Sequence, residues 1–94
     1  MYWDEYLLVC LGEELSESAQ EVAKCLRFTC NDKHSSKSES NLESLSREFS
    51  QAIAVIEMLA EEGIRIKIDQ NVIDDKKKRL LHYAKHSRKL GVLK

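Results

Sequence analysis

Ninety-four residues make one small domain, near the lower size limit for a chain that buries an adequate core alone. The absence of proline and the presence of only three glycines leave almost nothing to interrupt helices, and the composition, with 33% charged residues and a net charge of −1, is otherwise that of a soluble globular protein. No apolar run approaches the roughly 20 residues that span a bilayer, and the acidic start differs from a basic signal peptide, so we expect a cytoplasmic protein without membrane partners.

Residues 2–28 are predicted to form one long helix. Its apolar residues recur at steps of three and four and form one stripe, which is expected to face the core: Leu8, Leu11, Leu15, Ala19, Val22 and Leu26. Glu14, Glu17 and Glu21 lie roughly 100–160° from the centre of that stripe, beside apolar neighbours, as residues that line a cleft would. Gly12 costs the helix about 1 kcal/mol relative to alanine, which the close approach of another helix would explain.

Residues 29–41 are polar and rich in serine, which predicts a flexible loop that either only connects helices or lies beside a substrate. Cys30 and His34 in this loop are spaced like metal ligands, but two ligands do not make a four-ligand zinc site, and we interpret the spacing as chance. The three cysteines form no C-x-x-C pair, which fits a reducing compartment.

A second helix is expected from a cap at Ser40 or Asn41, with Glu43 placed for a capping box, to Gly63. Its apolar positions cover more than one side: Leu42, Leu45, Phe49, Ala52, Ile53, Val55, Ile56, Met58 and Leu59. Such a helix is expected to be central and to contribute to a subunit interface. Glu48 lies at the edge of its apolar seam and Gln51 lies beyond that edge.

Residues 64–68 alternate as a strand would, but without a partner strand they are expected to form an extended connector. A third helix is predicted from Gln70 to Leu90, capped by Asp69 and ended by Gly91. Charge is distributed unevenly, because residues 1–62 carry thirteen acids and five bases, whereas residues 76–94 carry eight bases and no acid. The neutral total and the lack of interleaved aromatic residues argue against a nucleic-acid partner.

These elements predict an all-α fold, an antiparallel bundle with three to four helices per chain, in which residues 1–94 form a single domain. The apolar content of the second helix would leave surface unburied in a monomer. A core completed between subunits is the economical solution, which predicts a homodimer or a homotetramer.

Two short acidic patterns predict a cation site if their helices pack together. Glu14 and Glu17 are three residues apart on the first helix, and Glu48 and Gln51 have the same spacing on the second. Three carboxylates and one amide oxygen suit Mg²⁺ or Mn²⁺, whereas zinc or haem would need histidine or cysteine ligands. From chemistry alone, paired acids on a helix are more often a solvated face.

The pattern Glu13-Glu14-x-x-Glu17, followed after a loop by Glu48-x-x-Gln51, resembles the signature of the MazG-like superfamily of all-α nucleoside triphosphate pyrophosphohydrolases. The similarity extends through residues 6–12, 19–28 and 54–63, which look like small, stand-alone, phage-encoded members, and it covers about residues 6 to 80.

The resemblance implies a function and a set of site residues. Members bind a nucleoside triphosphate through Mg²⁺ and hydrolyse its α–β bond to a nucleoside monophosphate and pyrophosphate. Glu14, Glu17 and Glu48 would then be catalytic, and Mg²⁺ (or Mn²⁺) would be held by Glu14, Glu17, Glu48 and Gln51. Basic residues of the last helix resemble positions that hold the phosphates, namely Lys76, Lys77, Lys78 and Arg79, although a run of lysines is more often a solvated face.

Gln51 departs from the pattern, because the family has an aspartate there. Glutamine offers a carbonyl oxygen but no charge, and the loop between the two motifs is longer than in compact members. Three hypotheses follow: a Mg²⁺-dependent pyrophosphohydrolase acting on (d)NTPs; a weak or inactive relative that binds a nucleotide or a protein; and an unrelated helical interaction protein with surface acids.

Overall fold

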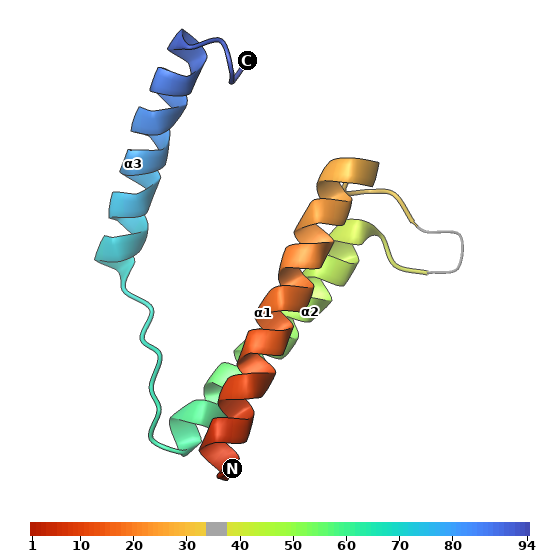
Figure 1. Ribbon diagram of the computed structural model, residues 1–94, viewed down its shortest axis with the longest axis vertical. Helices are drawn as coiled ribbons and strands as arrows, with labels where there is room; N and C mark the ends of the chain where they lie inside the picture. Colours follow the sequence, from red (N-terminus) through yellow and green to blue (C-terminus); the bar gives the residue numbers. More distant parts are fainter. Residues whose placement is uncertain (34–37) are drawn as a thin grey trace.

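The protein is described by a computed structural model that covers residues 1–33 and 38–94. It contains three helices, α1 (Trp3–Phe28), α2 (Asn41–Glu61) and α3 (Gln70–Lys89), and the described residues form no strand beyond one isolated bridge between Lys33 and Ser40. Helices α1 and α2 lie side by side and antiparallel, whereas α3 stands apart from them (Figure 1). The predicted all-α fold class is confirmed.

The helix ends lie where local capping chemistry predicts them. The Ser40 hydroxyl accepts a hydrogen bond from the Glu43 amide at 3.1 Å, and the Glu43 carboxylate accepts one from the Ser40 amide at 3.2 Å, which completes the capping box of α2. Asp69 accepts a hydrogen bond from the Asn71 amide at 2.8 Å and caps α3. Gly63, with a φ of 87°, follows α2 in the left-handed region that glycine tolerates.

Backbone contacts join the end of α1 to the start of α2. The Asn41 side chain donates to the Thr29 carbonyl at 2.9 Å, and the Leu42 amide donates to the Cys30 carbonyl at 2.9 Å. These bonds hold Thr29 at a φ of 76°, which is uncommon for a β-branched residue. The predicted flexible loop includes residues 34–37, which lie outside the described part of the chain. His34, whose spacing from Cys30 was interpreted as chance, is one of these residues.

The contact between α1 and α2 is only partly apolar. Leu7, Ala52 and Leu59 are its buried apolar side chains. Toward the loop the buried side chains are polar instead: Ser18 and Glu21 of α1, and Asn41, Ser44 and Glu48 of α2. The two helices therefore meet through a mixed seam rather than through a continuous hydrophobic core.

The orientation of α1 differs from the expected one. Leu15 is 49% exposed, and Leu8, Val22 and Leu26 of the same stripe are also exposed, because α1 turns its acidic side toward α2. Spacing located the apolar stripe correctly, but it did not determine which neighbour covers the stripe. Within one chain, α2 covers the side that carries Leu7, Ser18 and Glu21.

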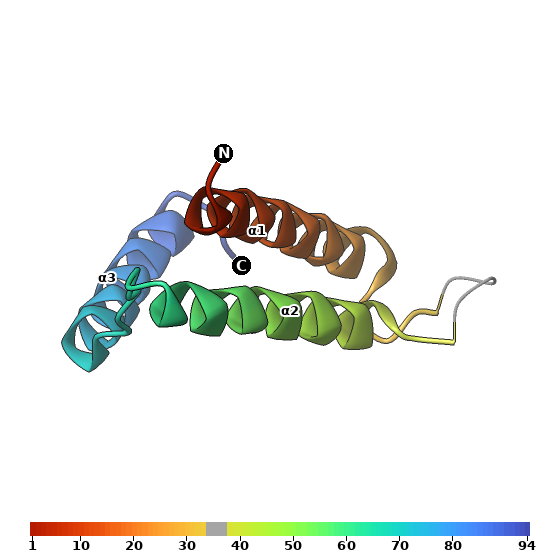
Figure 2. The same ribbon diagram turned by 90° about the horizontal axis from the view of Figure 1, so that it is seen from below.

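Helix α3 packs against neither of the other helices. None of its residues is buried, and its apolar stripe, which includes Ile73 and Leu80, is uncovered by α1 or α2. The Cα radius of gyration is 17.1 Å, against about 12 Å for a compact chain of this length. In the view of Figure 2, α3 is placed at one end of the α1–α2 pair and does not run along it. No helix in the described residues has the length and apolar character needed to cross a membrane.

Candidate metal centre

The two acidic patterns meet at the middle of the α1–α2 contact. Each of Glu14, Glu17 and Glu48 contributes one carboxylate oxygen to a group whose members all lie within 4.8 Å of one another. Glu48 is buried at 7% exposure, Glu14 is half-buried and Glu17 is exposed. The antiparallel packing thus places the three predicted acids together, with one side of the group open.

Gln51 belongs to the same cluster, one turn after Glu48 on α2. With its side-chain amide oriented so that the nitrogen faces the acids, it donates to Glu48 Oε2 at 3.0 Å and to Glu14 Oε2 at 3.1 Å. The amide therefore links the two helices as a hydrogen-bond donor. To act as a metal ligand it would have to rotate and present its carbonyl oxygen, since the amide nitrogen is not a ligand.

Arg47 is a member of the site that sequence reasoning missed. Its Nη1 donates to Glu48 Oε1 at 2.8 Å, and its Nε donates to both oxygens of Glu39 at 3.2 Å. Adjacent residues of a helix point about 100° apart, so spacing gave no signal that Arg47 would turn back toward Glu48. The guanidinium supplies a positive charge beside the most buried acid of the cluster.

Mutual repulsion and hydrogen bonding shift the pKa values of the three acids in different directions. Burial, followed by the neighbouring Glu48, raises the pKa of Glu14. A carboxyl–carboxyl hydrogen bond with Glu48 raises the pKa of Glu17, and the same bond, together with Arg47, lowers the pKa of Glu48. Glu48 is therefore the acid of the cluster that ionises first as pH rises. Glu14 and Glu17 keep their protons to higher pH, as expected where like charges converge.

The donor set fits a hard divalent cation. Oxygens bound to Mg²⁺ at about 2.1 Å lie at most about 4.2 Å apart, so the three carboxylates need to move by less than about 1 Å to share an ion. The set contains only oxygen donors, which suits Mg²⁺ or Mn²⁺ rather than zinc. Two features make the cluster less suited to a divalent cation. The Gln51 amide is a neutral donor, and the Arg47 guanidinium is positively charged.

Glu21 lies one turn beyond Glu17 but does not join the cluster. It is buried at 7% exposure and forms an ion pair with Lys24 at 3.1 Å. Its Oε2 atom is buried and finds no hydrogen-bond partner among the described residues. The polar seam therefore extends past the cluster toward the loop, with a carboxylate that is only half satisfied.

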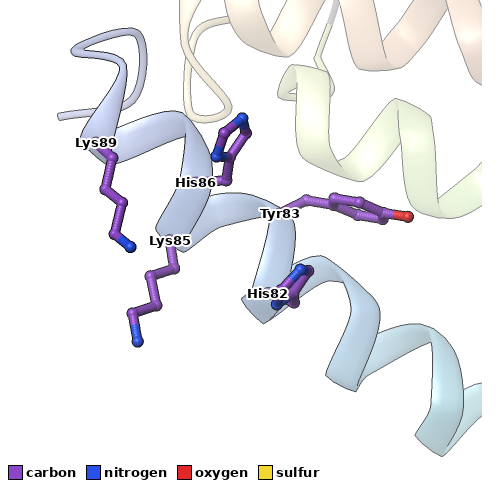
Figure 3. A pocket seen from close by; sticks show the side chains of 5 residues that line it. All are labelled: His82, Tyr83, Lys85, His86 and Lys89. Atoms are coloured by element: carbon purple, nitrogen blue, oxygen red, sulfur yellow. The ribbon is translucent and has the colours of Figure 1, made fainter.

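The predicted phosphate-binding residues do not lie beside the acidic cluster. Lys76, Lys77 and Arg79 belong to α3, which contacts neither α1 nor α2, and Arg79 pairs with Asp75 of its own helix at 3.1 Å. A separate open pocket lies on α3 itself (Figure 3). It is lined by His82, Tyr83, Lys85, His86 and Lys89, and it contains none of the clustered acids.

Comparison with known proteins assigns neither a family nor a function to the chain. No protein-family model matches the sequence, and no curated protein or solved structure matches the chain. The geometry of the acidic cluster and the motif resemblance therefore remain as the indications of function.

Proposed function

We propose that the protein is a Mg²⁺-dependent nucleoside triphosphate pyrophosphohydrolase of the MazG-like type. The observation that carries this proposal is the convergence of Glu14, Glu17 and Glu48 from two helices, within 4.8 Å of one another. The acids of an unrelated helical protein would have no reason to converge, so the convergence favours the proposal over that hypothesis. The motif resemblance supplies the triphosphate as the ligand class.

The residues of this chain have distinct roles in the proposed reaction. Glu14, Glu17 and Glu48 would hold the cation, which when bound neutralises triphosphate charge and activates a water. The water oxygen attacks the α-phosphorus, the α–β bridging bond breaks and pyrophosphate leaves with the electron pair. Glu17 is the exposed acid of the cluster, so it is the acid that an attacking water can reach and the one suited to accept the water proton.

One observation favours a second candidate, a relative that binds without efficient hydrolysis. The Gln51 amide donates to Glu48 and Glu14, so in this arrangement a neutral donor occupies the side of the cluster where a fourth carboxylate is expected. A loss of one formal charge weakens binding of a divalent cation and shifts its position. Such a protein would retain metal or nucleotide binding and release little pyrophosphate.

Pyrophosphate release from a panel of canonical, deoxy and oxidised nucleoside triphosphates separates the candidates. We expect release that requires Mg²⁺ or Mn²⁺ and that is lost in Glu14→Gln and Glu48→Gln. Glu57→Gln is the matched control, because Glu57 is an exposed acid of α2 outside the cluster. Mn²⁺ binding with no release from any substrate would favour the binding candidate, and absence of both would contradict the metal site.

A further inference from the structure

Two aromatic side chains at the start of α1 form an exposed stack. The ring centroids of Trp3 and Tyr6 lie 5.6 Å apart, and the two ring planes make an angle of 13°, which is the geometry of a stacked pair. Each of the two residues is 51% exposed, so the pair is a surface feature and not part of the core. The Glu5 carboxylate accepts a hydrogen bond from the Tyr2 amide at 2.9 Å and fixes the start of the helix that carries the rings. We call the Trp3–Tyr6 pair the aromatic stack.

The aromatic stack lies on the side of α1 where the acidic cluster is open. With 100° of rotation per residue, Trp3 and Tyr6 lie within about 40° of Glu17, the exposed acid of the cluster. Helix α1 runs without interruption from one group to the other (Figure 1). A ligand that approaches the acids from this side therefore also meets the rings.

Helix α2 adds an apolar residue to the same side. Gln51, the α2 amide of the cluster, and Met58 lie within about 20° of each other around α2. Both are rotated from the α2 side chains buried against α1, in the same sense in which Glu17 and Tyr6 are rotated from the buried side chains of α1. Because the helices are antiparallel, equal senses bring all four to one side of the pair. Met58, which is 40% exposed, is near the end of α2 that lies beside the start of α1 (Figure 1).

The spacing along α1 suits a nucleotide. Tyr6 precedes Glu14 by eight residues, which corresponds to about 12 Å along the helix axis. A base on the ring of Tyr6 and phosphates at the acids would thus be separated by about the length of an extended nucleoside triphosphate. Cys10 of α1 and Val55 of α2, both half-buried, lie between the two ends and offer uncharged surface to the sugar.

We propose that the aromatic stack is the base-binding subsite for the nucleoside triphosphate whose phosphates the acidic cluster holds through its cation. The inference rests on the proposed function, because the cluster determines where the phosphates lie. Every base has a π-face, so stacking on Trp3 and Tyr6 binds all bases and discriminates weakly between them. We therefore expect the chain to accept several (d)NTPs, with purines bound more tightly than pyrimidines because a purine has the larger stacking area.

A comparison of a nucleotide with inorganic tripolyphosphate tests the subsite. Both ligands carry phosphates, but only the nucleotide carries a base. The full chain is titrated in Mg²⁺ with each ligand by calorimetry, the nucleotide being the α,β-methylene analogue of dATP, which resists cleavage at the α–β position. We expect the analogue to bind at least about tenfold more tightly than tripolyphosphate. The analogue should also quench the fluorescence of Trp3, the only tryptophan of the chain, which tripolyphosphate should leave unchanged.

Variants test the contribution of each ring. Trp3→Ala and Tyr6→Ala should each weaken binding of the analogue about tenfold and leave the affinity for tripolyphosphate unchanged, because the base loses a stacking partner. Tyr6→Phe keeps the ring and should keep the affinity. Tyr83→Ala is the matched control, since Tyr83 is an exposed tyrosine of α3, which does not contact α1. In turnover of (d)NTPs, Tyr6→Ala should raise KM and leave kcat unchanged.

The outcomes separate this inference from the proposed function. Equal affinities for the analogue and tripolyphosphate, with no change in Trp3 fluorescence, would overturn the base subsite and leave the phosphate site intact. Tighter binding of the analogue that persists in Trp3→Ala and Tyr6→Ala would also overturn it. Absence of Mg²⁺-dependent binding of either ligand would contradict the proposed function and the inference with it. Tyr6→Leu, which keeps apolar bulk and removes the π-face, replaces Tyr6→Ala if the alanine variant loses helix content by circular dichroism.

Discussion

The side-chain nitrogen of Gln51 on α2 lies 3.1 Å from Glu14 Oε2 on α1, so a single neutral amide connects the two halves of the acidic cluster. The amide gives hydrogen bonds to two acids that otherwise repel each other. It therefore stabilises the metal-free chain, and it does so from a position where a fourth acid would strengthen cation binding.

Replacing Gln51 with aspartate should lower the stability of the metal-free chain and raise its affinity for a cation. Gln51→Asp is expected to tighten Mn²⁺ binding about tenfold or more, measured by calorimetry, because the new carboxylate adds a formal charge and a ligand oxygen. Without metal, the same variant should unfold at a lower urea concentration, since a fourth acid joins the cluster. Ser50→Asp, which adds the same charge on an exposed side of α2, should leave Mn²⁺ affinity unchanged; equal tightening there would point to a non-specific charge effect.

Metal addition should stabilise the fold. An ion that binds only the folded chain, at about 100 times its dissociation constant, raises the free energy of unfolding by about 2.7 kcal/mol. We expect a corresponding rise in the urea midpoint with Mn²⁺, followed by circular dichroism, and its reversal by a chelator. Glu48→Gln should abolish the rise. An equal rise in that variant would place the ion elsewhere.

The capping box of α2 should make stability depend on pH. Hydrogen bonds from the Ser40 backbone and hydroxyl lower the pKa of Glu43 from its ordinary value of 4.5. A depressed pKa in the folded state contributes stability that is complete above the unfolded pKa and is lost as pH falls through the folded pKa. The free energy of unfolding should therefore contain a component that declines as pH drops below about 4.5. Glu43→Gln should remove this component, whereas Ser40→Ala, which keeps the Ser40 backbone donor, should only reduce it. A decline of the same size in Glu43→Gln would assign it to other groups.

Replacing Glu21 with an apolar residue should raise the free energy of unfolding. Its Oε2 atom is buried without a partner in the described residues, and its ion pair with Lys24 is partly exposed to water. Glu21→Met removes the unsatisfied oxygen and keeps much of the volume, so we expect the free energy of unfolding to rise by about 1 kcal/mol in urea titrations. Glu13→Met, at an exposed position of α1, should change it by less than about 0.5 kcal/mol. A loss in Glu21→Met would show that the Lys24 pair outweighs the unsatisfied atom.

The helix boundaries were predictable because capping is local. Ser40 with Glu43, Asp69, and the glycines at 63 and 91 each act within a few residues of their own position, and the structure confirms the helix ends that they predict. The convergence of Glu14 and Glu17 with Glu48 was also predictable, but only from the motif resemblance. Spacing alone placed these acids on two helices without saying that the helices would meet through them.

The remaining features of the structure could not be predicted from spacing, because they depend on which helix packs against which surface. The Leu8–Leu15–Val22 stripe was expected in the core of the chain, yet α2 packs against the acidic side of α1 and leaves this stripe exposed. Arg47 could not be predicted from spacing, since its long side chain reaches Glu48 although adjacent residues of a helix point about 100° apart. The placement of Lys76 and Lys77 beside the acids was inferred by resemblance, and α3 makes no contact that would bring them there.

The mixed seam between α1 and α2 has a consequence for how the chain folds. Leu7, Ala52 and Leu59 are the only buried apolar side chains in the described residues. Three such side chains make a very small apolar core for two helices of this length. In the homodimer that the sequence predicts, a second chain would cover the exposed apolar residues of α1 and α2, and folding would be a second-order process: refolding should accelerate with protein concentration, and dilution should lower the thermal midpoint.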